Sequence, residues 1–136
     1  MIEVQIITPE KVLLAESGCI RVDLPLTSGE YEVRENHAPY MANLSSGVAV
    51  IEKDGDESDI ILTVHGGFVQ IAENTIKIVV QAAELKSEID FDRAKESKER
   101  ADQRLKNPGN FKETIDVSRA KSSFNRATTR LKLRDM

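Results

Sequence analysis

Hydrophobic residues alternate with polar ones over the first part of the chain and recur every three to four positions over the last part. The alternating segments predict β-strands at residues 2–7, 11–16, 19–24, 47–53, 59–64, 68–72 and 75–81. Turn-forming residues separate several of these segments, among them Pro9 and the Glu73-Asn74 pair. Many short strands at this spacing are typical of an antiparallel sandwich or barrel.

The apolar period changes at Ser87, and two helices are predicted from there on. Ser87 and Asp90 have the spacing of a capping box, so we expect the first helix to begin at Ser87 and to end near Lys106. The segment Asn107-Pro108-Gly109-Asn110 predicts a turn, and a second helix is expected from about Asp116 to Leu133.

Each predicted helix carries a narrow stripe of small and apolar residues. The stripes consist of Ala94, Ser97, Ala101 and Leu105 on the first helix and Val117, Ala120, Phe124, Ala127 and Leu131 on the second. An antiparallel pair would place Ala94 opposite Ala127, Ala101 opposite Ala120 and Leu105 opposite Val117. Alanine contacts bury little area and gain only a few kcal/mol, which is less than the entropy lost on ordering the segment. We therefore expect the hairpin to need the sandwich, a ligand or a partner, and to have more than one arrangement.

The predicted fold is an all-β N-terminal sandwich followed by a C-terminal antiparallel two-helix hairpin, with domains at residues 1–84 and 85–136. Charge changes at the same boundary. Residues 1–84 carry 14 acidic and 5 basic side chains, whereas residues 85–136 carry 9 acidic and 14 basic ones. A negative body and a positive appendage suggest two physical roles within one chain.

Composition argues against several classes of site. Cys19 is the only cysteine, so an internal disulfide and a cysteine-built zinc site are excluded and no metal site is expected. A buried, reduced thiol is the interpretation we favour, and it fits a reducing compartment. No apolar run approaches the roughly 20 residues that span a bilayer, and the start of the chain does not resemble a signal peptide. We expect a soluble chain that reaches a membrane only through partners.

Catalytic and nucleic-acid functions have little support in the sequence. His37 and His65 are the only histidines, and no phosphate-binding glycine loop or nucleophile motif is present, so no catalytic residue is predicted. His37 lies in a turn and is interpreted as an ordinary surface histidine. Gly66-Gly67 lies between predicted strands and indicates a bulge or a close backbone approach. The basic residues alternate with acidic ones and aromatic residues are few, which argues against nucleic acid as a partner.

A group of charged residues is predicted at the open end of the hairpin. The antiparallel register places Asp90, Asp92 and Arg93 level with Arg130, with Arg126 one turn away. Glu84 precedes the first helix at the same end. One interpretation is a solvated ion-pair network of little energetic value. The other is an anion site, because arginine presents forked donors to phosphate and a carboxylate can accept from a base amine or a ribose hydroxyl.

Four motifs, in order along nearly the whole chain, resemble those of one known family. They are DLPLTSGEYEVRENHAP at residues 23–39, VHGGFVQI at 64–71, Ala83-Glu84 followed by IDFDRA at 89–94, and SRA with RATTRL at 118–131. Together they resemble the epsilon subunit of rotary F-type ATP synthases. Leu26 and Glu32 stand where the family usually has glycines, and Arg34 and Glu35 replace an apolar residue and a proline.

The resemblance implies a ten-stranded sandwich with a helical hairpin, in a non-catalytic subunit of the central stalk. The sandwich would bind the gamma subunit and the ring of c subunits, and would couple flow of protons or sodium ions to ATP synthesis. Glu30 and His37 match loop positions that lie near the c ring and gamma in relatives. The location implied is peripheral, at the cytoplasmic face of a bacterial cell membrane.

The resemblance also implies a regulatory role for the hairpin. In relatives the opened hairpin inhibits ATP hydrolysis by contacting an acidic segment of the catalytic beta subunit. Some relatives bind ATP on the folded hairpin, so ATP is expected as a regulatory ligand, with no cofactor required. The residues that match that site are Glu84, Ile89, Asp90, Arg93, Ala94, Arg126 and Arg130. A free-standing ATP-binding regulatory module is the alternative function.

Overall fold

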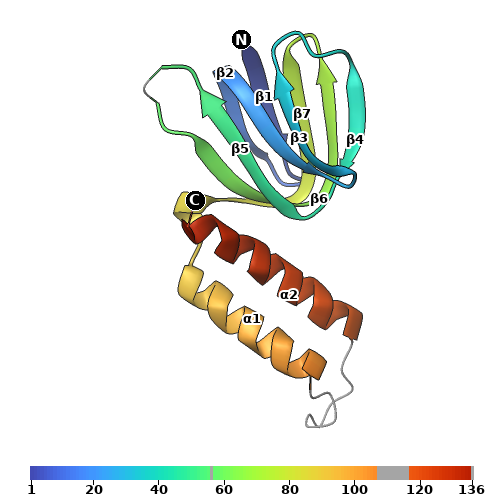
Figure 1. Cartoon of the computed structure of the whole chain (residues 1–136), viewed down its shortest axis with the longest axis vertical. Helices are drawn as coiled ribbons and strands as arrows, with labels where there is room; N and C mark the ends of the chain where they lie inside the picture. Colours follow the sequence, from blue (N-terminus) through green and yellow to red (C-terminus); the bar gives the residue numbers. More distant parts are fainter. Residues whose placement is uncertain (56, 107–116, 136) are drawn as a thin grey trace. The chain divides into compact units, whose positions relative to one another are not determined.

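The chain divides into two compact units, Met1–Lys86 and Ser87–Met136. The computed structural model describes residues 1–55, 57–106 and 117–135. Figure 1 shows the strands of the first unit and the paired helices of the second.

The first unit is built from seven strands that enclose one hydrophobic core. They are β1 (Ile2–Ile7), β2 (Val12–Leu26), β3 (Gly29–Arg34), β4 (Tyr40–Leu44), β5 (Gly47–Lys53), β6 (Ile60–Ala72) and β7 (Thr75–Leu85). The hydrogen-bonded order is β1-β7-β6-β4-β2-β3, while β5 joins β2 to β6 and β1 also pairs with β2. All pairs are antiparallel except β1 with β7, which is parallel.

The sandwich and hairpin are confirmed, but the expected count of about ten strands is wrong. β2, β6 and β7 run for 15, 13 and 11 residues, which is about two to three times the length of a typical strand. The sequence pattern divides β2 near Gly18 and β6 at Gly66. Both glycines have positive φ angles, of 69° and 62°. The strands continue through them, although the β1–β2 register shifts next to Gly18. A local change of phase therefore resembled a strand end.

Two strands, β3 and β4, were not predicted from the pattern. Glu30, Glu32 and Arg34 are exposed on β3, which pairs only with β2 and forms an edge of the sheet. Charged side chains are usual on such an edge because they oppose pairing with another chain.

The core is formed by one phase of the alternation in each strand. On the paired strands β1 and β7, the side chains that enter the core are at most 2% exposed. They are Ile2, Val4 and Ile6 of β1 and Ile76, Ile78 and Val80 of β7. Cys19 is also buried, as expected for a structural thiol. A β-carbon on Gly67 would lie 2.0 Å from the carbonyl oxygen of Val79, which confirms the predicted close backbone approach at Gly66-Gly67.

The second unit is an antiparallel pair of helices, α1 (Phe91–Lys106) and α2 (Val117–Lys132) (Figure 1). Short 3₁₀ turns, η1 (Lys86–Glu88) and η3 (Leu133–Asp135), precede α1 and follow α2. The cap of α1 is Asp90 and not Ser87. The Asp90 carboxylate accepts a hydrogen bond of 3.1 Å from the backbone N–H of Arg93, so it satisfies a donor that the first helical turn leaves open.

The predicted alanine seam is confirmed where it is described. Ala94 and Ala101 of α1 and Ala120 and Ala127 of α2 are each at most 5% exposed. Lys98 lies over the ring of Phe124, 5.6 Å from its centroid, which adds a cation–π contact between the helices. The predicted turn at 107–110, the start of the second helix near Asp116 and the contact made by the side chain of Val117 lie outside the described residues.

Candidate binding surfaces

A row of apolar side chains crosses the outer face of the sandwich. Cross-strand pairing places Val12 of β2 opposite Ile7 of β1, Ile7 opposite Val79 of β7, and Val79 opposite Phe68 of β6. Phe68 pairs with Asn43 of β4, and Met41 lies two residues from Asn43 on the same face. Opposed side chains in a sheet lie within contact distance, and diagonal neighbours are within reach of long side chains. Val12, Ile7, Val79 and Phe68, with Met41 diagonal to Phe68, therefore form one continuous surface, the apolar strip.

The apolar strip is open to solvent over much of its length. Met41, Val12 and Phe68 are 63%, 58% and 38% exposed, and Ile7 and Val79 are half-buried. A parallel row of Gln5, Lys77 and Gln70 lies beside the strip on the same strands. An apolar centre with a polar border is the usual anatomy of a protein-binding surface.

The sequence reasoning missed the apolar strip, although a signal was present. Ile6-Ile7, Phe68-Val69 and Val79-Val80 are pairs of consecutive apolar residues within alternating strands. In each pair one residue enters the core and the other must face outward.

Glu30 and His37, the two residues expected at the stalk contact, lie at opposite ends of β3. Glu30 pairs with Pro25 next to the β2–β3 turn, whereas His37 follows the far end of the strand. The chain turns back after β3, because the ring of His37 contacts Tyr31, the residue next to Glu30. Successive side chains of a strand point to opposite faces, so Glu30 and the Tyr31–His37 contact lie on different faces of β3.

The β2–β3 ribbon beside Glu30 is rich in charge. Glu32 forms an ion pair with Arg34, and Arg21 lies 3.6 Å from Asp23 and 3.3 Å from Glu52. Burial raises the pKa of Asp23, an effect that Arg21 opposes and that the neighbouring carboxylates reinforce. Leu26 is 3% exposed and belongs to the core at the turn end of the ribbon, where it pairs with Gly29.

His37 belongs to a compact aromatic cluster, and the expectation of an ordinary surface histidine is wrong. Its Nε2 lies 2.6 Å from the hydroxyl of Tyr31, and its Nδ1 lies 2.6 Å from the carbonyl oxygen of Ala38. The ring of Tyr31 stacks on that of Tyr40 at a centroid distance of 5.6 Å. The His37 ring lies 5.6 Å from Tyr31 and 6.1 Å from Tyr40.

The residues expected to bind ATP fall in both units. Glu84 is on β7 of the sandwich, opposite Thr63 in the β6–β7 ladder. The remaining six are in the hairpin unit, where Ala94 is buried, Ile89 and Arg130 are half-buried, and Asp90, Arg93 and Arg126 are exposed.

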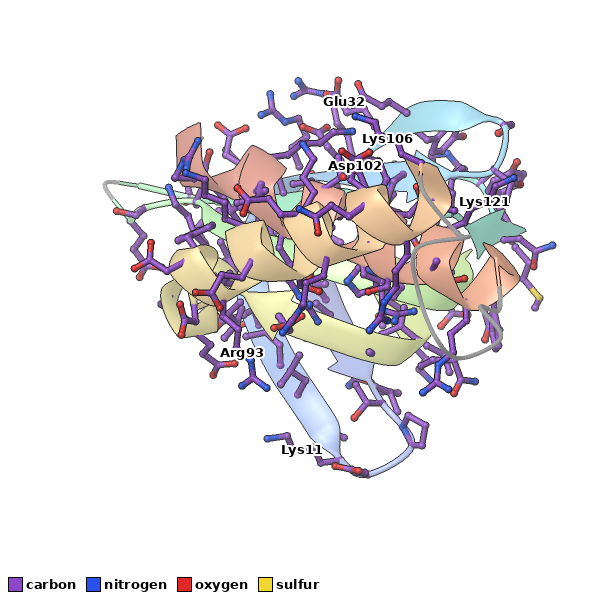
Figure 2. All side chains as sticks on the ribbon, turned by 90° about the horizontal axis from the view of Figure 1, so that it is seen from below. Lys11, Glu32, Arg93, Asp102, Lys106 and Lys121 are labelled. Atoms are coloured by element: carbon purple, nitrogen blue, oxygen red, sulfur yellow. The ribbon has the colours of Figure 1, made fainter. Side chains whose placement is uncertain are left out.

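Within the hairpin, the arginines of this group lie toward one end. Figure 2 shows Arg93 at one end of α1, and Lys106 and Lys121 toward the other. Because the helices are antiparallel, the last turns of α2, which carry Arg126 and Arg130, lie at the Arg93 end. The structure thus brings the three arginines to one end, while Asp90 already uses its carboxylate to cap α1.

Of the two helices of the hairpin, α2 has the larger net positive charge. This helix carries five basic residues and no acidic one, whereas α1 carries six basic and four acidic residues. The basic residues of α2 are Arg119, Lys121, Arg126, Arg130 and Lys132. Such a helix has a positive electrostatic potential, which favours binding of an acidic partner or an anion.

The described parts of the chain hold neither a candidate metal-ligand cluster nor a helix suited to cross a membrane. Across residues 1–55, 57–106 and 117–135, no group of three or more His, Cys, Asp or Glu side chains is arranged to hold a metal ion. In the same ranges, none of the helices has the length and apolar character needed to cross a membrane.

Comparison with known proteins assigns the family. Residues 1–86 match the family described as ATP synthase, Delta/Epsilon chain, beta-sandwich domain, and residues 87–134 match the corresponding long alpha-helix domain. The chain belongs to the ATP synthase epsilon-chain family. It is 41% identical over 102 residues to the ATP synthase epsilon chain of Symbiobacterium thermophilum, an alignment that covers 75% of this chain and 72% of that one. It is 35% identical over 106 residues to the epsilon chain of Desulfosudis oleivorans, covering 78% of each.

Solved structures share the fold of this epsilon-family chain. A chain in the Euglena gracilis mitochondrial ATP synthase, in an assembly of OSCP, F1 and c-ring, matches with a TM-score of 0.81 at 16% identity. The match covers 94% of this chain and 78% of that one. A chain from the central stalk and c-ring of the Tetrahymena thermophila mitochondrial enzyme matches with a TM-score of 0.57 at 21% identity, covering 97% and 92%.

Proposed function

We propose that this chain is a non-catalytic subunit of the central stalk of a bacterial F-type ATP synthase, and that its sandwich binds the gamma subunit through the apolar strip. The observation that carries the proposal is the strip itself: four apolar side chains paired across β2, β1, β7 and β6, with Met41 of β4 diagonal to Phe68. Exposed apolar rows of this kind usually mark a protein contact. Membership of the epsilon-chain family, and the stalk assemblies in which chains of like fold occur, support the proposal of gamma as the partner.

The contact with the c ring is assigned to the charged end of the β2–β3 ribbon. Glu30 is exposed there, beside the Glu32–Arg34 ion pair. A polar, charged contact suits a surface that meets the loops of a membrane ring, whereas the apolar strip suits a permanent partner. With gamma and the ring bound at separate surfaces, the sandwich couples ion flow through the ring to ATP synthesis. The chain is held through these partners at the cytoplasmic face of the cell membrane, as a peripheral subunit.

Regulation is assigned to the hairpin. The alanine seam gives α1 and α2 little buried area, so the pair is held together by a small free energy. The uniformly basic α2 then supplies attraction to the acidic segment of the beta subunit, where it inhibits ATP hydrolysis. The two properties together suit an element that leaves one arrangement for another.

ATP is proposed as a regulatory ligand of the folded hairpin. Arg93, Arg126 and Arg130 supply phosphate donors at one end of the hairpin. Ile89 and Ala94 belong to the same part of the hairpin unit, and Asp90 is the candidate acceptor there for the base or ribose. Glu84, which belongs to the sandwich unit, is the remaining residue that the resemblance implies. Arg126→Ala is expected to weaken ATP binding by about 1–3 kcal/mol, through loss of a charged hydrogen bond. Lys121→Ala, a change of an exposed cation at the other end of the hairpin, is the matched control, and calorimetry that finds equal affinity for both variants removes the site.

The proposed function is tested by binding of the purified chain to gamma and to a gamma–c ring complex. We expect a stable complex with gamma, and a further contribution from the ring that falls when Glu30 is changed to Gln. If the chain binds ATP but does not bind gamma, the result would instead support the alternative function, a free-standing ATP-binding regulatory module.

A further inference from the structure

We infer that His37 is a positioning residue: it holds the start of β4 so that Met41, at one end of the apolar strip, is presented in a fixed place. The inference rests on the proposed function only in naming gamma as the partner of the strip. The positioning itself follows from the hydrogen bonds and ring contacts of the Tyr31–His37–Tyr40 cluster.

The hydrogen bonds of His37 define its tautomer. A carbonyl oxygen can only accept, so the nitrogen that faces Ala38, Nδ1, carries the proton and donates it. In the neutral ring, Nε2 is then an acceptor and takes a hydrogen bond from the Tyr31 hydroxyl. Both ring nitrogens of His37 are thus used inside the sandwich.

The two bonds connect different parts of the sandwich. Tyr31 belongs to β3 and packs against the hydrophobic core, so it is a fixed point. Ala38 lies in the connection that leads through Pro39 into β4, which begins at Tyr40. The imidazole therefore joins a strand of the core to the backbone immediately before β4.

The same connection is held at a second place. The backbone N–H of Asn36 donates to the side-chain oxygen of Asn74, in the β6–β7 turn, at 2.7 Å. The stacking of Tyr31 on Tyr40 completes the set, because it attaches the first residue of β4 to the same core tyrosine. Met41, which follows directly, is 63% exposed and has little packing of its own to fix it.

Two tyrosine variants separate the hydrogen bond from the aromatic packing. Tyr31→Phe removes the hydroxyl group that donates a hydrogen bond to His37, and it keeps the aromatic ring. Tyr40→Phe is the matched control, because within the described part of the chain the hydroxyl of Tyr40 makes no hydrogen bond. We expect Tyr31→Phe to speed amide exchange of residues 40–42 in the free chain by about two- to tenfold and to weaken gamma binding by a similar factor, as loss of one hydrogen bond implies. Tyr40→Phe should change neither.

Two further measurements test the tautomer of His37 and whether His37 and Tyr31 act through the same hydrogen bond. NMR of the ring nitrogens in the free chain should show the His37 proton on Nδ1. His37→Asn keeps a donor near the Nδ1 position and loses the acceptor, so it should reproduce Tyr31→Phe, and the double variant should be no worse than either single one.

The inference is overturned if the proton is on Nε2, if the two tyrosine variants exchange alike, or if exchange changes without any change in gamma binding. Failure of the unmodified chain to bind gamma would instead overturn the proposed function. In that case, exchange in the free chain still decides whether His37 holds the start of β4.

Discussion

The two ends of the apolar strip give the sharpest test of the stalk contact. Full burial of a Met or Val side chain is worth about 1.5–3 kcal/mol, and Met41 and Val12 leave 63% and 58% of their surface exposed. Covering each by gamma should therefore contribute about 1–2 kcal/mol. Met41→Gln and Val12→Thr keep the approximate size of each side chain while removing its apolar character, so each should weaken gamma binding by about 5- to 30-fold.

The assay is titration of purified gamma with the unmodified chain, each single variant and the double variant. Met41 and Val12 lie on strands at opposite ends of the strip, so their losses should add to within about 0.5 kcal/mol. Unfolding of the free chain should change little, because both side chains face outward and exposed substitutions seldom shift stability by more than about 0.5 kcal/mol.

Ile20→Thr is the control for exposed apolar surface in general. Ile20 is 36% exposed on β2 but lies outside the apolar strip. If Met41→Gln and Val12→Thr bind gamma as tightly as the unmodified chain, or if Ile20→Thr is weakened equally, the strip is not the contact surface.

Three further predictions concern stability. Gly67→Ala should destabilise the sandwich by about 2–3 kcal/mol or more in denaturant unfolding, because its β-carbon would overlap the β7 backbone. Gly55→Ala meets no atom within 4 Å and should cost about 1 kcal/mol for its positive φ alone, so equal losses would contradict the close-approach argument. Asp23→Asn should stabilise the sandwich at neutral pH, because burial raises the pKa of Asp23 in the folded state and its ionised form is therefore disfavoured there. That advantage should shrink as the pH falls through the raised pKa toward the ordinary value of 3.8, and an advantage that grows on acidification would show that the sign is wrong. Asp90→Ala should lower the stability of the hairpin by about 1 kcal/mol, because α1 loses its N-terminal cap; the loss is measured from the helical signal on heating. Ser87→Ala, which removes no cap, is the control. A larger loss of stability for Ser87→Ala would show that Ser87 is the cap.

Sequence patterning predicts those parts of the fold where one phase of residues enters a core. The alternation in β1 and β7 and the alanine spacing of α1 and α2 each have a single consistent interpretation, and both were confirmed. The pattern fails where a glycine changes the phase of a continuing strand, as at Gly18 and Gly66. It also fails for β3, where outward charge conceals the inward positions of Tyr31 and Val33.

The functional surfaces were less accessible to sequence reasoning than the fold. The apolar strip depends on the register between β1, β7 and β6, which no single segment encodes. The role of His37 depends on Tyr31 and on the backbone of Ala38, so its surroundings could not be inferred from the turn in which it lies. In contrast, the placement of Glu30 and Tyr31 on opposite faces follows directly once β3 is recognised as one strand.

The continuity of β2, β6 and β7 has a mechanical consequence under the proposed function, in which the sandwich turns with the central stalk. Two separate sheets held only by side-chain packing can slide past one another when twisted. Here the backbone itself passes from one layer to the other, so a torsional load is carried by covalent bonds and hydrogen-bonded ladders. Under force, the sandwich should therefore resist shear and yield in one cooperative step.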